Sequence, residues 1–376
     1  MLALSINNFL SIYHFYEKER VMKSTWFKSI FIAGGALLLA SDSFAGAKLK
    51  VSDTTSINFG GSIRVEVADT DTDTDSGDSD SFGTSIHSAR FYMKAKVTDT
   101  IGFQLQTEHK DGDMLMLDSL VKVKLADNIQ LWAGRFIPPS DRSNLSGSYN
   151  LPTWQYPGVA SRYPIPKKGG RDDGFAIIGS AAGGQLDYSL GMFGGKADAT
   201  VPKDTESVSG RVAYSFLDKE GYLTRSTYLG SKDIMTIGYT FMKQSDAFGD
   251  VSGTTDFSAS NIDFLLEKNL ADGSVATVEA ALYDYDEFGA ASKEGDAAMV
   301  SVAYMPDGIF GLGRLQASVR YQEFSPDDNS GDTTRVDVGL TSLINGHGAR
   351  VGIYFGDQET GSSSTETIKL GIQLKL

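Results

Sequence analysis

The C-terminal nine residues alternate strictly between apolar and polar or small side chains. Ile368, Leu370, Ile372, Leu374 and Leu376 are apolar, and lysine, glycine or glutamine separates them. A period of two predicts a β-strand with one apolar and one polar face. Because a strand at the end of a chain must pair with another strand, this pattern favours a sheet that closes into a barrel. A closed barrel is one of the two structures that can span a bilayer.

The same alternation recurs between turn signals along most of the chain and predicts sixteen strands. These strands are expected at 56–68, 85–97, 101–109, 114–125, 129–136, 172–181, 185–194, 206–217, 234–245, 259–269, 275–286, 296–305, 314–324, 333–343, 349–357 and 366–376. An even number of antiparallel strands is typical of bacterial outer-membrane barrels and puts both chain ends on the periplasmic side. The predicted fold is therefore all-β, a 16-stranded antiparallel transmembrane β-barrel.

The connections between these strands alternate in length. Short, turn-like connections at 98–100, 126–128, 182–184, 270–274 and 344–348 read as periplasmic turns, and longer, acidic connections at 69–81, 246–258 and 325–332 read as extracellular loops. The connection at 218–233 is long although it falls on the periplasmic side. This length indicates either that the connection carries additional structure or that one of the neighbouring strands is wrongly assigned.

The N-terminal residues have the features of a secretory signal peptide. Lys23 and Lys28 supply basic charge, residues 30–40 are apolar, and the run Ser43-Phe44-Ala45 fits a cleavage site. We predict a signal peptide at 22–45, preceded by an over-long start at 1–21, and a barrel domain over 46–376. An exported barrel belongs in the outer membrane of a Gram-negative bacterium.

Composition narrows the function classes. Residues 1–45 hold four of the 34 Lys and Arg and three of the 48 Asp and Glu, so the rest of the chain has a net charge of −15. That balance argues against a nucleic-acid partner, and the absence of cysteine excludes disulfides. The 41 glycines and 37 Phe and Tyr residues suit a barrel, although a soluble secreted β protein has a similar composition.

The longest connection, 137–171, is a candidate constriction loop. A long loop in a compact domain is usually functional, and a sixteen-stranded barrel is too wide to be filled by side chains of its wall. The loop holds six of the nine prolines and one acidic residue, Asp141. Its basic residues are Arg142, Arg162, Lys167, Lys168 and Arg171. We expect the loop to fold inward; the alternative is a mobile external loop with solvated lysines.

Strand alternation also assigns side chains to the lumen. The inward cations are predicted to be Arg90, Lys94, Lys96, Lys122, Lys124, Arg211, Arg314, Arg320, Arg335 and Arg350, and the inward acids Glu66, Asp263, Glu267, Glu279 and Asp337. An excess of cations in a pore favours anions, whereas a lumen of mixed charge could simply order water. Leu131 and Trp132 imply opposite registers for strand 129–136.

No metal or cofactor site emerges from the motifs. Asp71, Asp73 and Asp75 have the spacing of a calcium loop, but Ser76 stands where that loop needs glycine, and Phe82 where it needs glutamate. The four histidines lack metal-ligand spacing. The acidic loop could still bridge divalent cations at the lipopolysaccharide surface.

Several segments resemble the phosphate-selective porin O and P family. They are 134–145, 164–174 with the run Gly169-Gly170-Arg171-Asp172-Asp173-Gly174, 210–214, Tyr222, 227–230 and 232–234. The resemblance implies a sixteen-stranded, usually trimeric, passive channel with a basic pore.

These features together predict a porin, not an enzyme. Small hydrophilic solutes would diffuse through a water-filled lumen, with a preference for anions and phosphate-type anions among them. The expected partners are such solutes, outer-membrane lipid and lipopolysaccharide, and two further copies of the chain in a homotrimer. The alternatives are a lipase-like barrel enzyme and a non-conducting structural or adhesion barrel.

Overall fold

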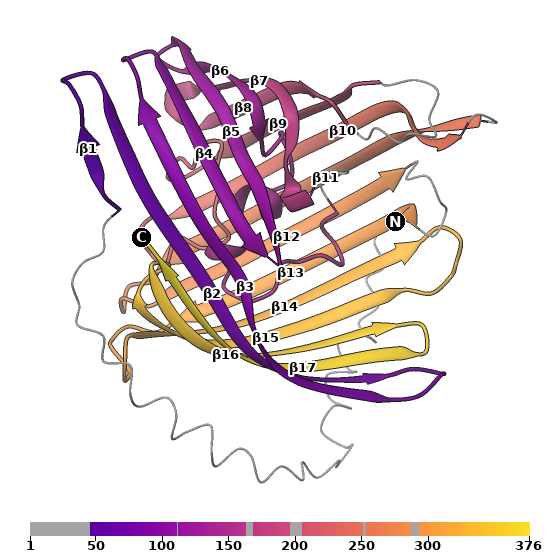
Figure 1. Ribbon diagram of the computed structural model, residues 1–376. Helices are drawn as coiled ribbons and strands as arrows, with labels where there is room; N and C mark the ends of the chain where they lie inside the picture. The colour runs from indigo at the N-terminus through magenta and orange to yellow at the C-terminus, as the bar shows by residue number, and fades with distance from the viewer. Residues whose placement is uncertain (1–45, 111, 163–167, 196–204, 251–252, 287–292) are drawn as a thin grey trace. The chain divides into compact units, whose positions relative to one another are not determined.

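The computed structural model describes residues 46–110, 112–162, 168–195, 205–250, 253–286 and 293–376 (Figure 1). The predicted signal peptide lies outside these ranges, so its cleavage stays a prediction. None of the helices within them is both long and apolar enough to cross a bilayer.

A single antiparallel sheet forms a closed barrel of sixteen strands, as the sequence predicts. Each strand from β2 to β16 pairs with the next, and β17 pairs with β2. The barrel strands are β2 (Ser56–Asp73), β3 (Ser79–Lys96), β4 (Ile101–Lys110), β5 (Asp113–Ala126), β6 (Ile129–Phe136), β7 (Asp172–Ala181), β8 (Leu186–Phe193), β9 (Ser207–Ser215), β10 (Ile234–Asp250), β11 (Gly253–Asn269), β12 (Val275–Asp286), β13 (Gly295–Met305), β14 (Arg314–Pro326), β15 (Thr333–Asn345), β16 (Ala349–Thr360) and β17 (Ser363–Lys375).

A short strand, β1 (Lys48–Lys50), covers part of the β2 edge at the seam of the barrel. The C-terminal strand pairs with β2 from Ser62 to Asp73, and β1 pairs with Ser56 to Asn58. The hydrogen bonds of both segments therefore continue along one edge of β2, where the backbone N–H of Leu376 donates to Gly61 and that of Phe59 donates to Ala47.

The predicted acidic loops at 69–81 and 246–258 are mostly strand, which corrects their assignment as loops. β2 continues to Asp73 and pairs with β3 as far as Thr72 opposite Ser79. The aspartates of this stretch alternate with β-branched threonines, which suit an extended backbone. Asp69, Asp71 and Asp73 are exposed and Thr70 and Thr72 are partly buried, so the alternation that defines a strand persists where every residue is polar.

Side chains alternate between the lumen and the outer surface throughout the wall. Val319 and Val338 are exposed on the outside at 49% and 42%, whereas Arg320 and Asp337 beside them are buried inside. In β6, whose register the sequence left open, Trp132 is the inward residue and packs against Tyr222. The outward apolar side chains form the surface that faces lipid in a membrane barrel.

Candidate functional site: the barrel lumen

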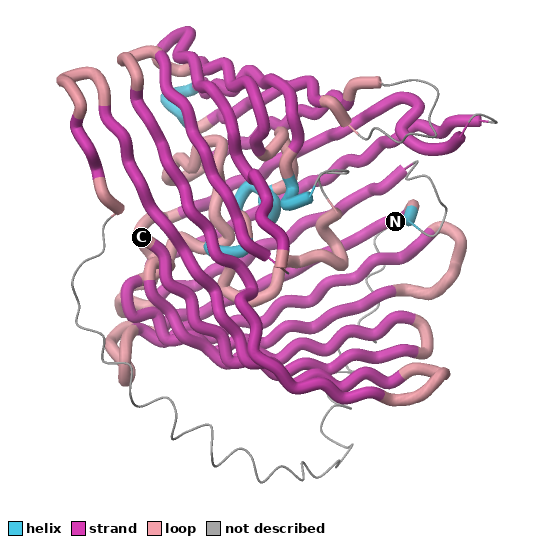
Figure 2. The backbone as a smooth tube through the Cα atoms, in the orientation of Figure 1, coloured by secondary structure: helices cyan, strands magenta, loops and turns pink. Residues whose placement is uncertain are grey.

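The loop 137–171 folds into the barrel, where Figure 2 shows short helical segments inside the ring of strands. One of them is α3 (Arg142–Ser146), and all five of its residues are buried. Trp154, further along the loop, is only 1% exposed, and its carbonyl accepts a hydrogen bond of 2.5 Å from Nη2 of Arg64. Its indole N–H donates to Glu66 on the wall.

Two further wall residues hold the same stretch of the loop by its backbone carbonyls. Arg350 donates to the carbonyl of Leu151, and Ser318 donates to that of Pro152 at 3.2 Å. Carbonyls held by inward side chains fix the path of the loop without requiring a regular element.

The loop also packs against an apolar part of the inner wall on β10 to β14. Val159 and Ala160 lie in one buried cluster with wall residues that include Met299 and Phe324. The hydroxyl of Tyr285 donates to the carbonyl of Ala160 at 2.6 Å. This side of the barrel interior is therefore filled by packed side chains of the loop and the wall.

Asp141 stabilises the start of α3. Its carboxylate accepts hydrogen bonds from the hydroxyls of Ser161 and Tyr283 and from the backbone N–H of Asn144. Burial raises the pKa of Asp141 to about 6, although these hydrogen bonds favour the charged form. The group therefore gains a proton in the folded protein within a mildly acidic range.

The periplasmic connection 216–233 also enters the lumen, where it meets the loop. The hydroxyl of Tyr222 donates to the carbonyl of Ile137 at 2.7 Å, and Glu267 on β11 accepts from Thr227 and from the backbone N–H of Tyr228. We call this segment the inward turn. The sequence-based assignment of the neighbouring strands is therefore correct, and the unexpected length of this connection is extra structure.

A chain of buried, alternating charges joins the loop, the inward turn and the wall. Both terminal nitrogens of Arg142 donate to Glu220, and both of Arg211 donate to Asp263. The Nε of Arg142 lies 3.5 Å from Asp263, which links the two pairs. All four side chains are almost completely buried. Their charges cancel within the chain, so Arg142 does not act as a free cation of the constriction, which corrects that expectation.

The other predicted loop cations differ in their surroundings. Arg171 is buried and donates to Asp118 at 3.2 Å, so it too is neutralised. Arg162 lies over the ring of Phe324 at 3.4 Å and donates to the carbonyl of Lys293. Lys168 begins the short helix η3 (Lys168–Gly170), and Lys167 lies outside the described residues.

Most of the predicted wall arginines are also engaged. Asp337 binds both Arg320 at 2.7 Å and Arg335 at 2.9 Å. Arg350 holds the loop, as above, and Arg314 donates to carbonyls of two neighbouring periplasmic turns. At the periplasmic rim, Lys96 and Lys124 pair with aspartates of adjacent turns. These wall arginines therefore bind carboxylates and backbone carbonyls inside the barrel, and their charge is largely engaged in those contacts.

Five basic residues are electrostatic neighbours toward the periplasmic end of the barrel interior, and we call them the basic vestibule. They are Arg90, Lys94, Lys122, Arg225 and Lys375. Lys375 interacts electrostatically with Arg225, Arg90 and Lys94, and Lys122 interacts with Lys94. The ammonium group of Lys122 stands 3.6 Å from the centre of the Trp132 ring.

Of these five, Arg90 alone has a carboxylate partner within the described part of the chain, Glu108 at 2.7 Å. Arg225 and Lys375 were not among the predicted site residues. Lys375 lies on the polar face of the C-terminal strand, so the alternation could have identified it. Arg225 lies on the inward turn, and no local pattern placed that turn in the lumen.

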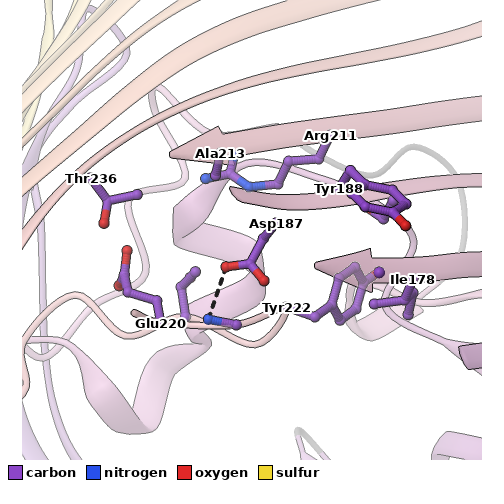
Figure 3. Close-up of a pocket in the computed structure, with 12 residues that line it drawn as sticks. Ile178, Asp187, Tyr188, Arg211, Ala213, Glu220, Tyr222 and Thr236 are labelled. Carbon is purple, nitrogen blue, oxygen red and sulfur yellow. Dashed lines mark hydrogen bonds between the residues drawn. The ribbon is translucent and has the colours of Figure 1, made fainter. Parts of the chain in front are cut away.

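A small pocket separates the inward turn from the wall formed by β7 to β10 (Figure 3). Asp187 points across it and accepts from the backbone N–H of Gly221 at 3.1 Å, while Tyr222 and Arg211 border the same space. Polar contacts beside the pocket therefore hold the turn to the wall, in addition to the apolar packing of Tyr222 against Trp132.

Comparisons with solved structures place this fold among bacterial porins. The loop-deletion variant of OmpT from Vibrio cholerae matches with a TM-score of 0.60 and 16% identity, over 86% of this chain and 100% of that chain. An anion-selective porin from Comamonas acidovorans matches at 0.58 and 13%, over 86% and 100%. OmpF of Salmonella typhi matches at 0.56 and 12%, over 87% and 100%. No curated protein sequence matches.

A closed sixteen-stranded barrel with a loop folded into a charged lumen defines an outer-membrane porin. The chain belongs to the phosphate-selective porin O and P family, whose model matches residues 57–283, more than half of the sequence. Family and fold point to a channel rather than an enzyme and to a Gram-negative outer membrane.

Proposed function

We propose that this porin prefers anions and that the basic vestibule carries the preference. Four of its five cations have no carboxylate partner in the described ranges, although the chain as a whole is acidic. Fixed positive charge in a narrow lumen raises the local concentration of anions and lowers that of cations. Phosphate-type anions are candidate solutes because lysine and arginine N–H groups match their oxygens.

The proposal also covers export, assembly and the membrane environment of the porin. The chain is exported after cleavage behind Ala45 and assembles as a homotrimer in outer-membrane lipid and lipopolysaccharide. The trimer is supported by the similarity to OmpT of Vibrio cholerae, which is described in a trimer form.

The test is the reversal potential of the reconstituted porin in a salt gradient. Lys94→Glu, Lys122→Glu and Lys375→Glu, singly and together, should shift the potential toward cation preference. Lys243→Glu is the matched control, because Lys243 is an exposed residue on the outer side of β10. An unchanged potential in the triple variant, with conductance intact, would refute the proposal.

A further inference from the structure

One periplasmic turn differs from the short turns at the same rim in the described part of the barrel. It joins β13 to β14 over residues 306–313, and its tip exposes Ile309 at 78%, Phe310 at 50% and Leu312 at 59%. The turns at 98–100, 127–128 and 271–273 consist of threonine, aspartate, asparagine, alanine and glycine instead. Three large apolar side chains in four residues form an unusual surface to leave in water.

The backbone gives this turn a defined shape. The N–H of Phe310 donates to the carbonyl of Gly313 at 2.8 Å. At its base, Nη2 of Arg314 donates to the carbonyls of Gly273 and Pro306, at 3.0 Å and 3.4 Å, and so ties the turn to its neighbour. The apolar tip is therefore held in place at the rim.

The exposed tip continues the outward apolar surface of the barrel. Val302 and Tyr304 precede it on the outer face of β13, and Leu270 in the β11–β12 turn and Ile344 near the end of β15 are also exposed. This outer surface is the part of the barrel that contacts lipid. The turn contains Asp307 and no lysine or arginine, so its charge does not favour an anionic surface.

We propose that the tip of this turn, Ile309, Phe310 and Leu312, inserts into the periplasmic leaflet of the outer membrane and anchors the barrel there. Its partner is the boundary between headgroups and acyl chains of zwitterionic phospholipid, where apolar and aromatic side chains are stabilised. This inference does not depend on the ion preference of the lumen.

The experiment uses Phe310→Trp in the complete porin, refolded into phosphatidylcholine vesicles with brominated acyl chains. The tryptophans of the barrel, Trp132 and Trp154, are buried in the lumen, and their signal is subtracted with the wild-type protein. We expect brominated lipid to quench the added fluorescence, most strongly with bromines near the headgroups.

Asp127→Trp is the control, because the side chain of Asp127 is 98% exposed on a polar turn of the same rim. It should respond to acrylamide in the water and not to brominated lipid. Leu312→Trp repeats the measurement if Phe310→Trp does not fold. Quenching of both tip positions by acrylamide as at position 127 would overturn the proposal. Protection from both quenchers would also overturn it, because the tip would then contact protein.

Discussion

Two segments enter the barrel from opposite ends, and they use their charges in opposite ways. The extracellular loop 137–171 is rich in arginine and lysine, yet Arg142 and Arg171 are buried against carboxylates. The periplasmic inward turn contributes the acid Glu220 to the same buried chain and exposes Arg225 to the lumen. A basic segment is therefore not the same as a basic surface, because the acids of the wall and of the inward turn decide which cations are neutralised.

The difference has a physical cause. A buried guanidinium loses its hydration and is tolerated only with a matching acceptor. The loop crosses the centre of the lumen, where Asp118 and Asp263 meet its arginines. In the vestibule, Lys94 and Arg225 are exposed and can stay charged without a partner, whereas Lys122 and Lys375 are partly buried.

The largest effect should come from breaking the link between the two segments. Glu220→Ala leaves Arg142 buried without its bidentate partner and should cost about 3–5 kcal/mol of stability. Arg162→Ala, which removes a contact with the Phe324 ring, should cost about 0.5–2 kcal/mol. Thermal unfolding in detergent measures both.

The double variant Arg142→Ala/Glu220→Ala is the control for that coupling. It should be less destabilised than the sum of the two single variants, because it leaves no unpaired charge. Equal losses for Glu220→Ala and Arg162→Ala would mean that the buried charge chain does not hold the two segments together.

A second test concerns the wall that both segments pack against. Val338→Arg places a charge on the lipid-facing side and should cost about 2–4 kcal/mol near the bilayer midplane. Gln106→Arg on the lumen side of β4 should fold nearly normally. Folding yield in vesicles compares the two, and equal yields would contradict the assignment of the faces.

Measurements of ion selectivity can test the contrast between the exposed Arg225 of the inward turn and the neutralised Arg171 of the loop. Arg225→Glu should shift the reversal potential toward cations, whereas the double variant Arg171→Gln/Asp118→Asn should leave it nearly unchanged, because Arg171 and Asp118 neutralise each other and both charges are removed together. The shift should be larger at 0.1 M than at 1 M salt, because the screening length falls from about 10 Å to about 3 Å. A larger shift for the variant at Arg171 than for Arg225→Glu would contradict the conclusion that the inward turn, and not the loop, supplies available positive charge.

The smallest effect is a pH dependence of loop docking. The pKa of Asp141 is raised from 3.8 to about 6 in the folded state. Its protonation therefore stabilises the fold fully below pH 3.8, and this contribution is lost as pH rises through about 6. Asp141→Asn should remove this dependence. The test is the unfolding temperature of the wild type and of Asp141→Asn on either side of pH 6. The same dependence of unfolding temperature on pH in the two proteins would exclude Asp141 as the cause.

By itself, the sequence determined the barrel and its sixteen strands, because a period of two is a local property. It did not determine how far β2 extends, because the acidic stretch at 69–73, which the sequence predicts as a loop, is strand. The same alternation placed Lys94 and Lys122 on the inner face. It also located the long loop, through its length and its prolines.

Only the tertiary structure decided which charges remain available in the lumen. The pairing of Arg142 with Glu220 joins residues 78 positions apart, and that of Arg211 with Asp263 joins residues 52 apart. No local pattern encodes such pairs. The inward turn depends on the same information, because its path is set by Glu267, Asp187 and the loop it meets. The local alternation of side chains thus determines the strands of the wall, whereas ion pairs between residues far apart in the sequence determine which charges remain in the lumen.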